Sequence, residues 1–159
     1  MTARLATLAD AQKIADLWNL GIAEKATWGL NFDRTPMTQS RVLKIMNHPV
    51  RHVFVVDATA AGRIDSWLLS RAGEGTSVEL VLMPPARSTL TALQRLAAIG
   101  RALRFSALQW PGFTEYYGII DPRATTLLAY LRNKNFRETP LPDGQIEVRD
   151  TLTRVASVA

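Results

Sequence analysis

Apolar residues in the first fifty positions recur every three or four residues, the period of a helix with one buried face. The first such helix is predicted from Leu8 to about Leu20, after a short strand at Arg4–Ala6. A second is predicted after Thr38, whose hydroxyl suits an N-cap, and before Pro49, which cannot continue a helix. The chain is therefore expected to open with one strand and two helices.

The pattern then changes to the alternation and β-branched composition that are typical of strands. Three strands are predicted at His52–Ala58, Arg63–Ser70 and Thr76–Met83, and the turn at residues 60–62 makes a hairpin of the first two. Pro84 and the proline after it end the third strand, because proline cannot donate a hydrogen bond to a neighbouring strand.

A long helix follows, beginning near Ser88 or Thr89 and stopping before Pro111. Its predicted apolar side consists of Leu93, Leu96, Ala97, Gly100, Leu103 and Ala107. The periodicity leaves Arg95 and Arg101 off that side.

The remaining elements complete an α/β order. They are a strand at Glu115–Ile120, a helix from Asp121 as N-cap to about Lys134, and closing strands at Phe136–Thr139 and Gln145–Leu152. The order is β-α-α-β-β-β-α-β-α-β-β, without an internal repeat or a linker. It predicts one domain over residues 1–159, with a mixed central sheet of about six to seven strands and helices on both faces.

The composition excludes several classes of protein. Hydrophobic residues make up 47% of the 159 residues and charged residues 21%, which is typical of a globular protein. No apolar run reaches the roughly 18 residues of a membrane span, and the N-terminus lacks the apolar block of a signal peptide. The chain has no cysteine, and Pro49 separates His48 from His52, so we expect no disulfide and no metal site. These features predict a cytoplasmic protein, or one inside a particle assembled in the cytoplasm.

The net charge of +5 favours anionic partners such as nucleic acid, CoA-type phosphates or an acidic protein surface. The basic residues are spread along the chain, and no run of five or more of them forms a basic tail. No nucleic-acid-binding motif is present, so contact with nucleic acid is expected through general basicity only.

Four segments of the chain combine this element order with local signals of a known family. They are ATLADAQKIADLWN, VFVVDATAAGRIDSWLL, VELVLMPPARSTLTALQRLAAIGRAL and DPRATTLLAYLRNKNFRE. In this order they resemble the opening strand and helix, the central hairpin, the fourth strand with its cofactor loop and helix, and the closing Asn-x-x-Ala…Gly-Phe segment of the GNAT acyltransferase superfamily. The resemblance covers nearly the whole chain and implies the GNAT fold.

The resemblance also implies a site for acetyl-CoA. The backbone of Val81, Leu82 and Met83 would hold the pantetheine arm. The pyrophosphate would lie on a loop and a helix N-terminus, whose N–H groups attract anions, formed by Arg87, Ser88, Thr89, Leu90, Thr91 and Ala92.

This loop departs from the family pattern Gln/Arg-x-x-Gly-x-Gly/Ala, in which glycine lets the backbone approach the phosphates closely. Arg87 and Ala92 fit the pattern, whereas Leu90 replaces the central glycine. Either the loop still binds phosphate through Arg87, nearby hydroxyls and the helix N-terminus, or Ser88 or Thr89 is an ordinary N-cap and Leu90 a core residue.

The resemblance suggests two catalytic candidates. Glu79 stands on the fourth strand, where family members often place a general base for the acceptor amine. Tyr130 is the candidate acid for the leaving thiolate, although the family register places the tyrosine at Leu128 or Leu131. Asn135 stands in for the glycine before Phe136. Each residue also has a non-catalytic interpretation. Glu79 would be an outward-facing residue on an edge or half-exposed strand, and Tyr130 an amphipathic residue at a packing boundary.

The cofactor loop, with Leu90 in place of glycine, and the tyrosine position on the last helix both depart from the family pattern. Our leading expectation is therefore a GNAT-fold protein that has lost catalysis. It would need no cofactor and would act as a binding or assembly module, for example as a structural component of a phage virion. Its partners would be other proteins or further copies of itself, with the apolar tail 151–159 as a docking segment. The alternative is an acetyl-CoA-dependent N-acetyltransferase acting on a small amine or a protein amine.

Overall fold

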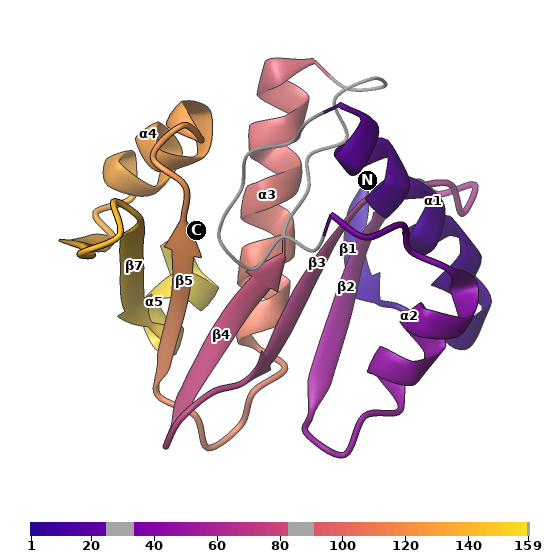
Figure 1. The fold of residues 1–159 in the computed structure, drawn as a ribbon, viewed down its shortest axis with the longest axis horizontal. Coiled ribbons are helices and arrows are strands. Elements are labelled where there is room, and N and C mark those ends of the chain that lie inside the picture. The colour runs from indigo at the N-terminus through magenta and orange to yellow at the C-terminus, as the bar shows by residue number, and fades with distance from the viewer. Residues whose placement is uncertain (25–33, 83–90, 159) are drawn as a thin grey trace.

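The computed structural model describes residues 1–24, 34–82 and 91–158, and these form one seven-stranded sheet (Figure 1). The strand order is β1-β2-β3-β4-β5-β7-β6, and β4 and β5 are the one parallel pair among the described strands. The strands are β1 (Thr2–Leu5), β2 (His52–Ala58), β3 (Ile64–Ala72), β4 (Ser77–Leu82), β5 (Glu115–Ile120), β6 (Arg137–Pro140) and β7 (Ile146–Thr151).

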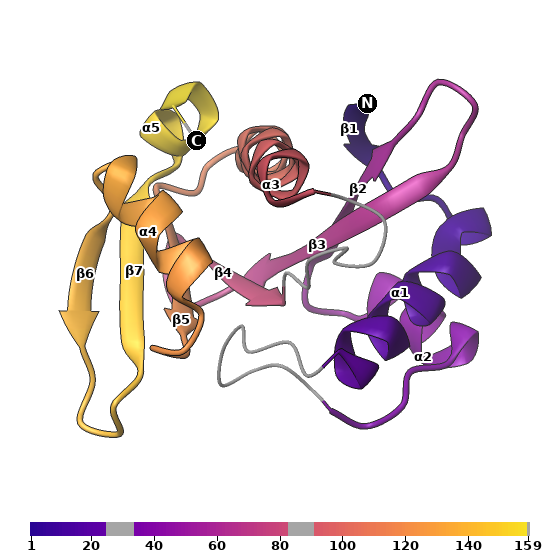
Figure 2. The ribbon, with the colours of Figure 1, turned by 90° about the horizontal axis from the view of Figure 1, so that it is seen from above.

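Helices cover both faces of this sheet, as predicted. They are the 3-10 turn η1 (Leu8–Asp10), α1 (Ala11–Ala23), α2 (Gln39–Met46), α3 (Ala92–Ala107), α4 (Thr125–Asn133) and α5 (Leu152–Val158). Figure 2 shows α1 and α2 on one face and α3 and α5 on the other. The predicted element order is confirmed, and α5 is an additional element that the sequence did not reveal. None of the helices in the described part of the chain is long and apolar enough to cross a membrane.

The two faces bury separate cores. On one face, α1 and α2 pack on β2 and β3, where the indole rings of Trp18 and Trp67 stack with their centroids 4.7 Å apart. The other core lies under α3, α4 and α5 and contains Leu68, Leu103 and Leu127. Strands β2 and β3 are buried on both faces. Because successive side chains of a strand point to opposite faces, each of these strands supplies side chains to both cores.

Two predicted helix starts are wrong. Helix α3 begins at Ala92, and its N-cap is Thr91, whose hydroxyl accepts a hydrogen bond from the Gln94 amide while the Gln94 side chain accepts one from the Thr91 amide. Neither Ser88 nor Thr89 is therefore the cap. Helix α4 begins at Thr125 instead of directly after Asp121, because the Asp121 carboxylate first accepts the Arg123 amide in a local turn.

The predicted apolar side of α3 is also partly wrong. Leu93 is 79% exposed and Ala97 is exposed, whereas Ile99, Ala102 and Ser106 are buried. The segment LQRLAAIGRAL is so rich in apolar residues that its periodicity fits more than one face, and packing against the sheet selects one of them.

The C-terminal tail forms α5 and folds back on α3. Leu152 and Val155 are buried in the core of the same chain, and the Arg154 guanidinium forms an ion pair with Asp150 at 2.8 Å. A docking role for residues 151–159 stays a prediction, but these two apolar side chains are already covered within the domain.

Candidate functional site

The sheet opens between β4 and β5. The two strands pair in parallel from Ser77 opposite Glu115 to Leu80 opposite Gly118, after which β4 continues to Leu82 beside β3, and β5 to Ile120 beside β7. Among these described residues, no register pair joins the last two residues of β4 to the last two of β5. The strands diverge visibly toward their C-terminal ends in Figure 1, and we call this divergence the split.

A β-bulge at Val81 explains the divergence. Ser70 on β3 pairs with Leu80 and Leu69 pairs with Leu82, so Val81 is an extra residue on β4. A bulge bends its strand and increases the local twist, which here turns β4 away from β5. Among the described strands, none pairs with Val81 and Leu82 on the side that faces β5, and backbone groups on such a side require another hydrogen-bond partner.

The N-terminus of α3 lies at the same end of the sheet as the open end of the split (Figure 1). Thr91 and Ala92, two of the predicted phosphate-binding residues, are both exposed there. Met83, Arg87, Ser88, Thr89 and Leu90 lie outside the described residues. A helix N-terminus concentrates N–H groups and positive potential, so its place at this end of the sheet suits an anionic group of a ligand that extends from the split.

Glu79 lies one residue before the last β4–β5 pair and is 8% exposed. Its Oε2 accepts a hydrogen bond from Nε of Arg71 on β3 at 2.8 Å. Tyr117 is its register partner on β5, and the pKa of that phenol is raised, first by burial and then by the negative charge of Glu79. Glu79 is therefore buried and paired with an arginine that the sequence analysis missed, and its role stays a prediction.

A belt of charged side chains extends from Glu79 across the same face of the sheet. The Arg149 guanidinium lies 4.7 Å from the ring centroid of Tyr117 and binds carboxylate oxygens of Glu115 at 2.6 Å and Glu147 at 3.0 Å. Gly73 makes room for the tyrosine, because a Cβ there would lie 2.9 Å from the Tyr117 hydroxyl. Strand alternation would have placed these residues on one face, had the strand order been known.

Tyr130 is half-buried on α4, where it packs against the core under α3. Burial raises the pKa of its phenol, and the charge of Arg104 on α3 opposes that rise. Leu128 and Leu131, the two positions that the family register gives, are both buried. Asn135 has a φ of 61°, a left-handed conformation that supports its glycine-like place at the end of α4.

Asp121 ends β5 at the open end of the split and is 7% exposed. Hydrogen bonds from Arg123, the shortest at 2.7 Å from Nη2, lower the pKa of this carboxyl, and the charge of Arg34 acts in the same direction. The segment at Arg34 therefore lies near this end of β5, although it precedes α2 in the sequence.

No metal centre accompanies this site: the described ranges contain no group of three or more His, Cys, Asp or Glu side chains that could hold an ion. His48 and His52 do lie close together, with ring centroids 4.9 Å apart in an edge-to-face contact.

Solved structures share this fold over almost their whole length. An aminoglycoside 6′-acetyltransferase type Ii superposes with a TM-score of 0.72 at 13% identity, covering 96% of this chain and 97% of the other. A GNAT phosphinothricin acetyltransferase from Sinorhizobium meliloti, in complex with acetyl-CoA, gives 0.68 at 14% identity, covering 94% and 87%. A spermidine N-acetyltransferase from Vibrio cholerae, in complex with CoA and spermine, gives 0.68 at 14% identity, covering 97% and 96%.

By sequence alone, no protein-family model and no curated protein matches this chain. The structural likeness nevertheless defines its class: the protein has the fold of the GNAT superfamily of acetyltransferases, as the resemblance of its four segments implied.

Proposed function

We propose that this protein is an acetyl-CoA-dependent N-acyltransferase that acts on an amine. The observation that carries the proposal is the split between β4 and β5 at the Val81 bulge, with the N-terminus of α3 at the same end of the sheet. Backbone groups gain stability from pairing, so a strand edge that no described strand covers favours a ligand there.

The residues present fit the cofactor. The pantetheine arm carries two amide groups, and these can exchange hydrogen bonds with the backbone of Val81 and Leu82 in the manner of a neighbouring strand. The Ala92 amide at the N-terminus of α3 would donate to phosphate oxygens, whereas the Thr91 amide already donates to the Gln94 side chain. Bound in this way, acetyl-CoA supplies an acyl group activated as a thioester.

Glu79 is the proposed proton acceptor. As the acceptor nitrogen bonds to the acyl carbon, its proton would pass to the Glu79 carboxylate, directly or through one water. Arg71 holds one carboxylate oxygen at 2.8 Å and so fixes the orientation of the group. Tyr130 would donate a proton to the sulfur as the carbon–sulfur bond breaks, and its half-buried place between α4 and α3 is compatible with a phenol that stays protonated.

This proposal replaces loss of catalysis as the leading interpretation. The three solved structures compared above are described as acetyltransferases, two of them with acetyl-CoA or CoA bound. No observation on the described residues supports an assembly role, a virion location or a loop that cannot bind CoA. These remain predictions, and a failure to bind acetyl-CoA would return them to first place.

The first test is thermal unfolding with and without acetyl-CoA. Ligand at about one hundred times its dissociation constant adds roughly 2.7 kcal/mol to the free energy of unfolding. For a chain of this size, the midpoint should rise by about 5–10 °C. ATP at the same concentration is the control, because a chain of charge +5 attracts any polyanion. No shift at millimolar acetyl-CoA, or an equal shift with ATP, would contradict the proposal.

Turnover is then followed by the CoA thiol that appears when an amine is acylated. The protein has no cysteine, so the released CoA is the only thiol in the assay. A panel of polyamines, amino acids and peptides with free amino groups would identify the acceptor class.

A further inference from the structure

The sheet has two edges, and they differ in how they avoid pairing with other chains. At one edge, all four residues of β6 are exposed, and their sequence, Arg-Glu-Thr-Pro, is charged and ends in proline. Charges and proline on an exposed strand prevent another strand from adding to it. The β6 edge is therefore protected against pairing with a strand of another chain.

The other edge is left open where β1 ends before β2 does. Strand β1 pairs with residues 55–58 of β2, the Ala6 amide donates to the Phe54 carbonyl at 2.9 Å, and the chain then turns into η1. Backbone groups alternate in direction along a strand. Since Phe54 faces β1 and the Arg51 carbonyl accepts from Ala72 on β3, the N–H and C=O of His52 point to the open edge.

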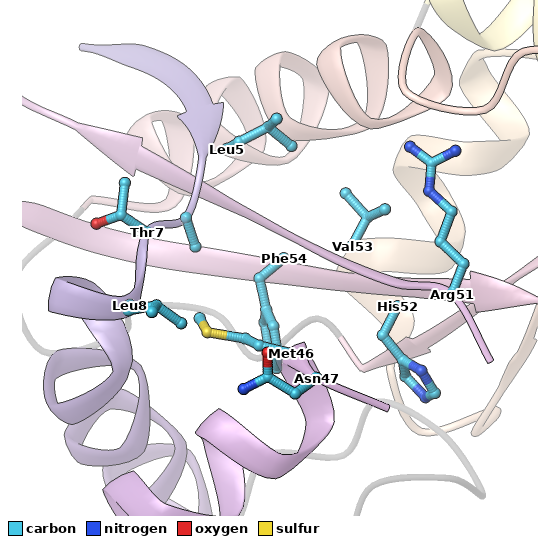
Figure 3. Close-up of a pocket in the computed structure, with 10 residues that line it drawn as sticks. Leu5, Thr7, Leu8, Met46, Asn47, Arg51, His52, Val53 and Phe54 are labelled. Carbon is cyan, nitrogen blue, oxygen red and sulfur yellow. The ribbon is translucent and has the colours of Figure 1, made fainter. Parts of the chain in front are cut away.

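A cavity of about 490 Å³ lies at this edge (Figure 3). Val53 and Phe54 form part of its lining on β2, and Leu5, Leu8 and Met46 line it from β1, η1 and α2. Leu5 is 47% exposed and Leu8 61%, and Val50, which adjoins the lining residue Arg51, is 46% exposed. Exposed apolar side chains at an open strand edge are the opposite of the arrangement at β6.

The charges at the cavity select the kind of occupant. Its ten lining residues, all described, include Arg51 and no Asp or Glu. The Arg51 guanidinium is held in place by the Gln109 carbonyl at 2.7 Å and by the Trp110 ring, whose centroid is 4.9 Å away. A second copy of this chain would bring a second Arg51 and a second charge of +5 to the interface, which disfavours self-association there.

We propose that this groove binds an extended, acidic segment of a partner protein. The segment would pair with the open edge of β2 at His52, place alternate apolar side chains against Leu5 and Leu8, and direct a carboxylate at Arg51. The groove lies at the start of β2, whereas the cofactor split lies between the C-terminal ends of β4 and β5. The two sites can therefore be filled together, and the proposal does not depend on catalysis.

The test uses fluorescein-labelled six-residue peptides and fluorescence anisotropy. The probe alternates Val and Thr and carries two Glu at one end; one comparison peptide carries Lys in place of Glu, and another carries Pro in place of the central Val. The acidic probe should bind at least tenfold more tightly than either comparison peptide. Leu8→Lys should weaken its binding at least tenfold, and Thr139→Lys on the protected β6 edge should leave it unchanged.

Amide hydrogen exchange provides the second measurement, because pairing with β2 should slow exchange at His52 when the probe is bound. Equal binding to wild type and Leu8→Lys, no binding of the acidic probe at millimolar concentration, or preference for the Lys peptide would each overturn the proposal. Dimerisation of the wild type that Leu8→Lys abolishes in sedimentation would also overturn it, since the occupant would then be a second copy.

Discussion

Asp57 and Glu79 are two buried carboxylates on neighbouring parts of the same sheet, and they are held in different ways. Asp57 on β2 is wholly buried, and Arg101 of α3 binds both of its oxygens, from Nε at 3.0 Å and from Nη2 at 2.7 Å. Glu79 on β4 receives one such bond from the neighbouring strand, at 2.8 Å.

The origin of the arginine distinguishes the two sites. Arg101 comes from another layer, so its pair with Asp57 fastens α3 to the sheet. Arg71 comes from the adjacent strand, so its pair with Glu79 joins two strands of the sheet and not two layers. We therefore expect Asp57 to act in stability, since its partner joins two layers, and we keep Glu79, next to the divergence of β4 from β5, as the candidate for chemistry.

The largest expected effect comes from removing the acid that joins the layers. Asp57→Ala should lower the free energy of unfolding by about 3 kcal/mol, because it breaks a buried ion pair and leaves Arg101 without its partner. The midpoint of thermal unfolding should fall by about 10 °C. Urea unfolding followed by tryptophan fluorescence measures the change, and a loss below about 1 kcal/mol would contradict the role assigned to this pair.

A double-mutant cycle sharpens that result. Arg101→Met alone should cost about 3 kcal/mol, since the wholly buried Asp57 would lose its partner. The double variant Asp57→Ala, Arg101→Met should lose less free energy of unfolding than the two single variants together, by at least about 1.5 kcal/mol. Additive losses would mean that the two residues act independently.

Glu79→Gln should leave stability almost unchanged and lower activity, the opposite of the result expected at Asp57. Its free energy of unfolding should change by no more than about 1 kcal/mol, because the amide keeps the size of the side chain and an oxygen to accept from Arg71. The kcat/KM for the acceptor amine should fall about a hundredfold or more. Acetyl-CoA should still raise the midpoint of thermal unfolding by the same amount as in wild type. Glu138→Gln, in the exposed pair with Arg132, is the matched control. Unchanged turnover in Glu79→Gln would remove its assignment as base.

The smallest expected effect concerns Asp10, a buried carboxylate whose partner Arg4 is itself only partly buried. Its oxygens accept from Arg4 at 2.7 Å and from the Thr7 amide at 2.8 Å, and the Arg4 hydrogen bond is the main reason why its pKa is lowered. A carboxyl with a lower pKa in the folded state stabilises the fold above its unfolded pKa, near 4, and loses that contribution as the pH falls through the folded pKa. Asp10→Asn should cost about 1 kcal/mol at pH 7, and the difference from wild type in urea should shrink as the pH falls from 4 toward 2. A difference that is independent of pH would contradict this account.

Much of the fold could be predicted from local pattern. The bounds of β2 and β5 were predicted at the residues where the structure has them, and the order of strands and helices up to β7 was confirmed. Turn and cap chemistry was less predictable, because several hydroxyl and carboxylate residues near a helix start compete for the same role. Thr91 and the turn at Asp121 decided the starts of α3 and α4 only after packing fixed where each helix must lie.

The candidate site was predicted in part. The sequence marked Glu79 through its place in an apolar strand, but Arg71 and Tyr117 became its neighbours only through strand pairing. Arg101 appeared as a residue off the apolar side of its helix, and Asp57 received no role. The ion pair between them spans 44 positions in the chain, a separation that no local period can connect.

By itself, the sequence determined the order of helices and strands up to β7, though not α5, because alternation and helical period are local properties of the chain. It also determined the resemblance to the GNAT superfamily, whose fold the structure supports. Only the tertiary structure decided where the sheet opens, since the bulge at Val81 exists only relative to the pairing of β4 with β3. The same holds for the open edge of β2 and for the partner of each buried acid, because these properties belong to the juxtaposition of distant segments and not to any one of them.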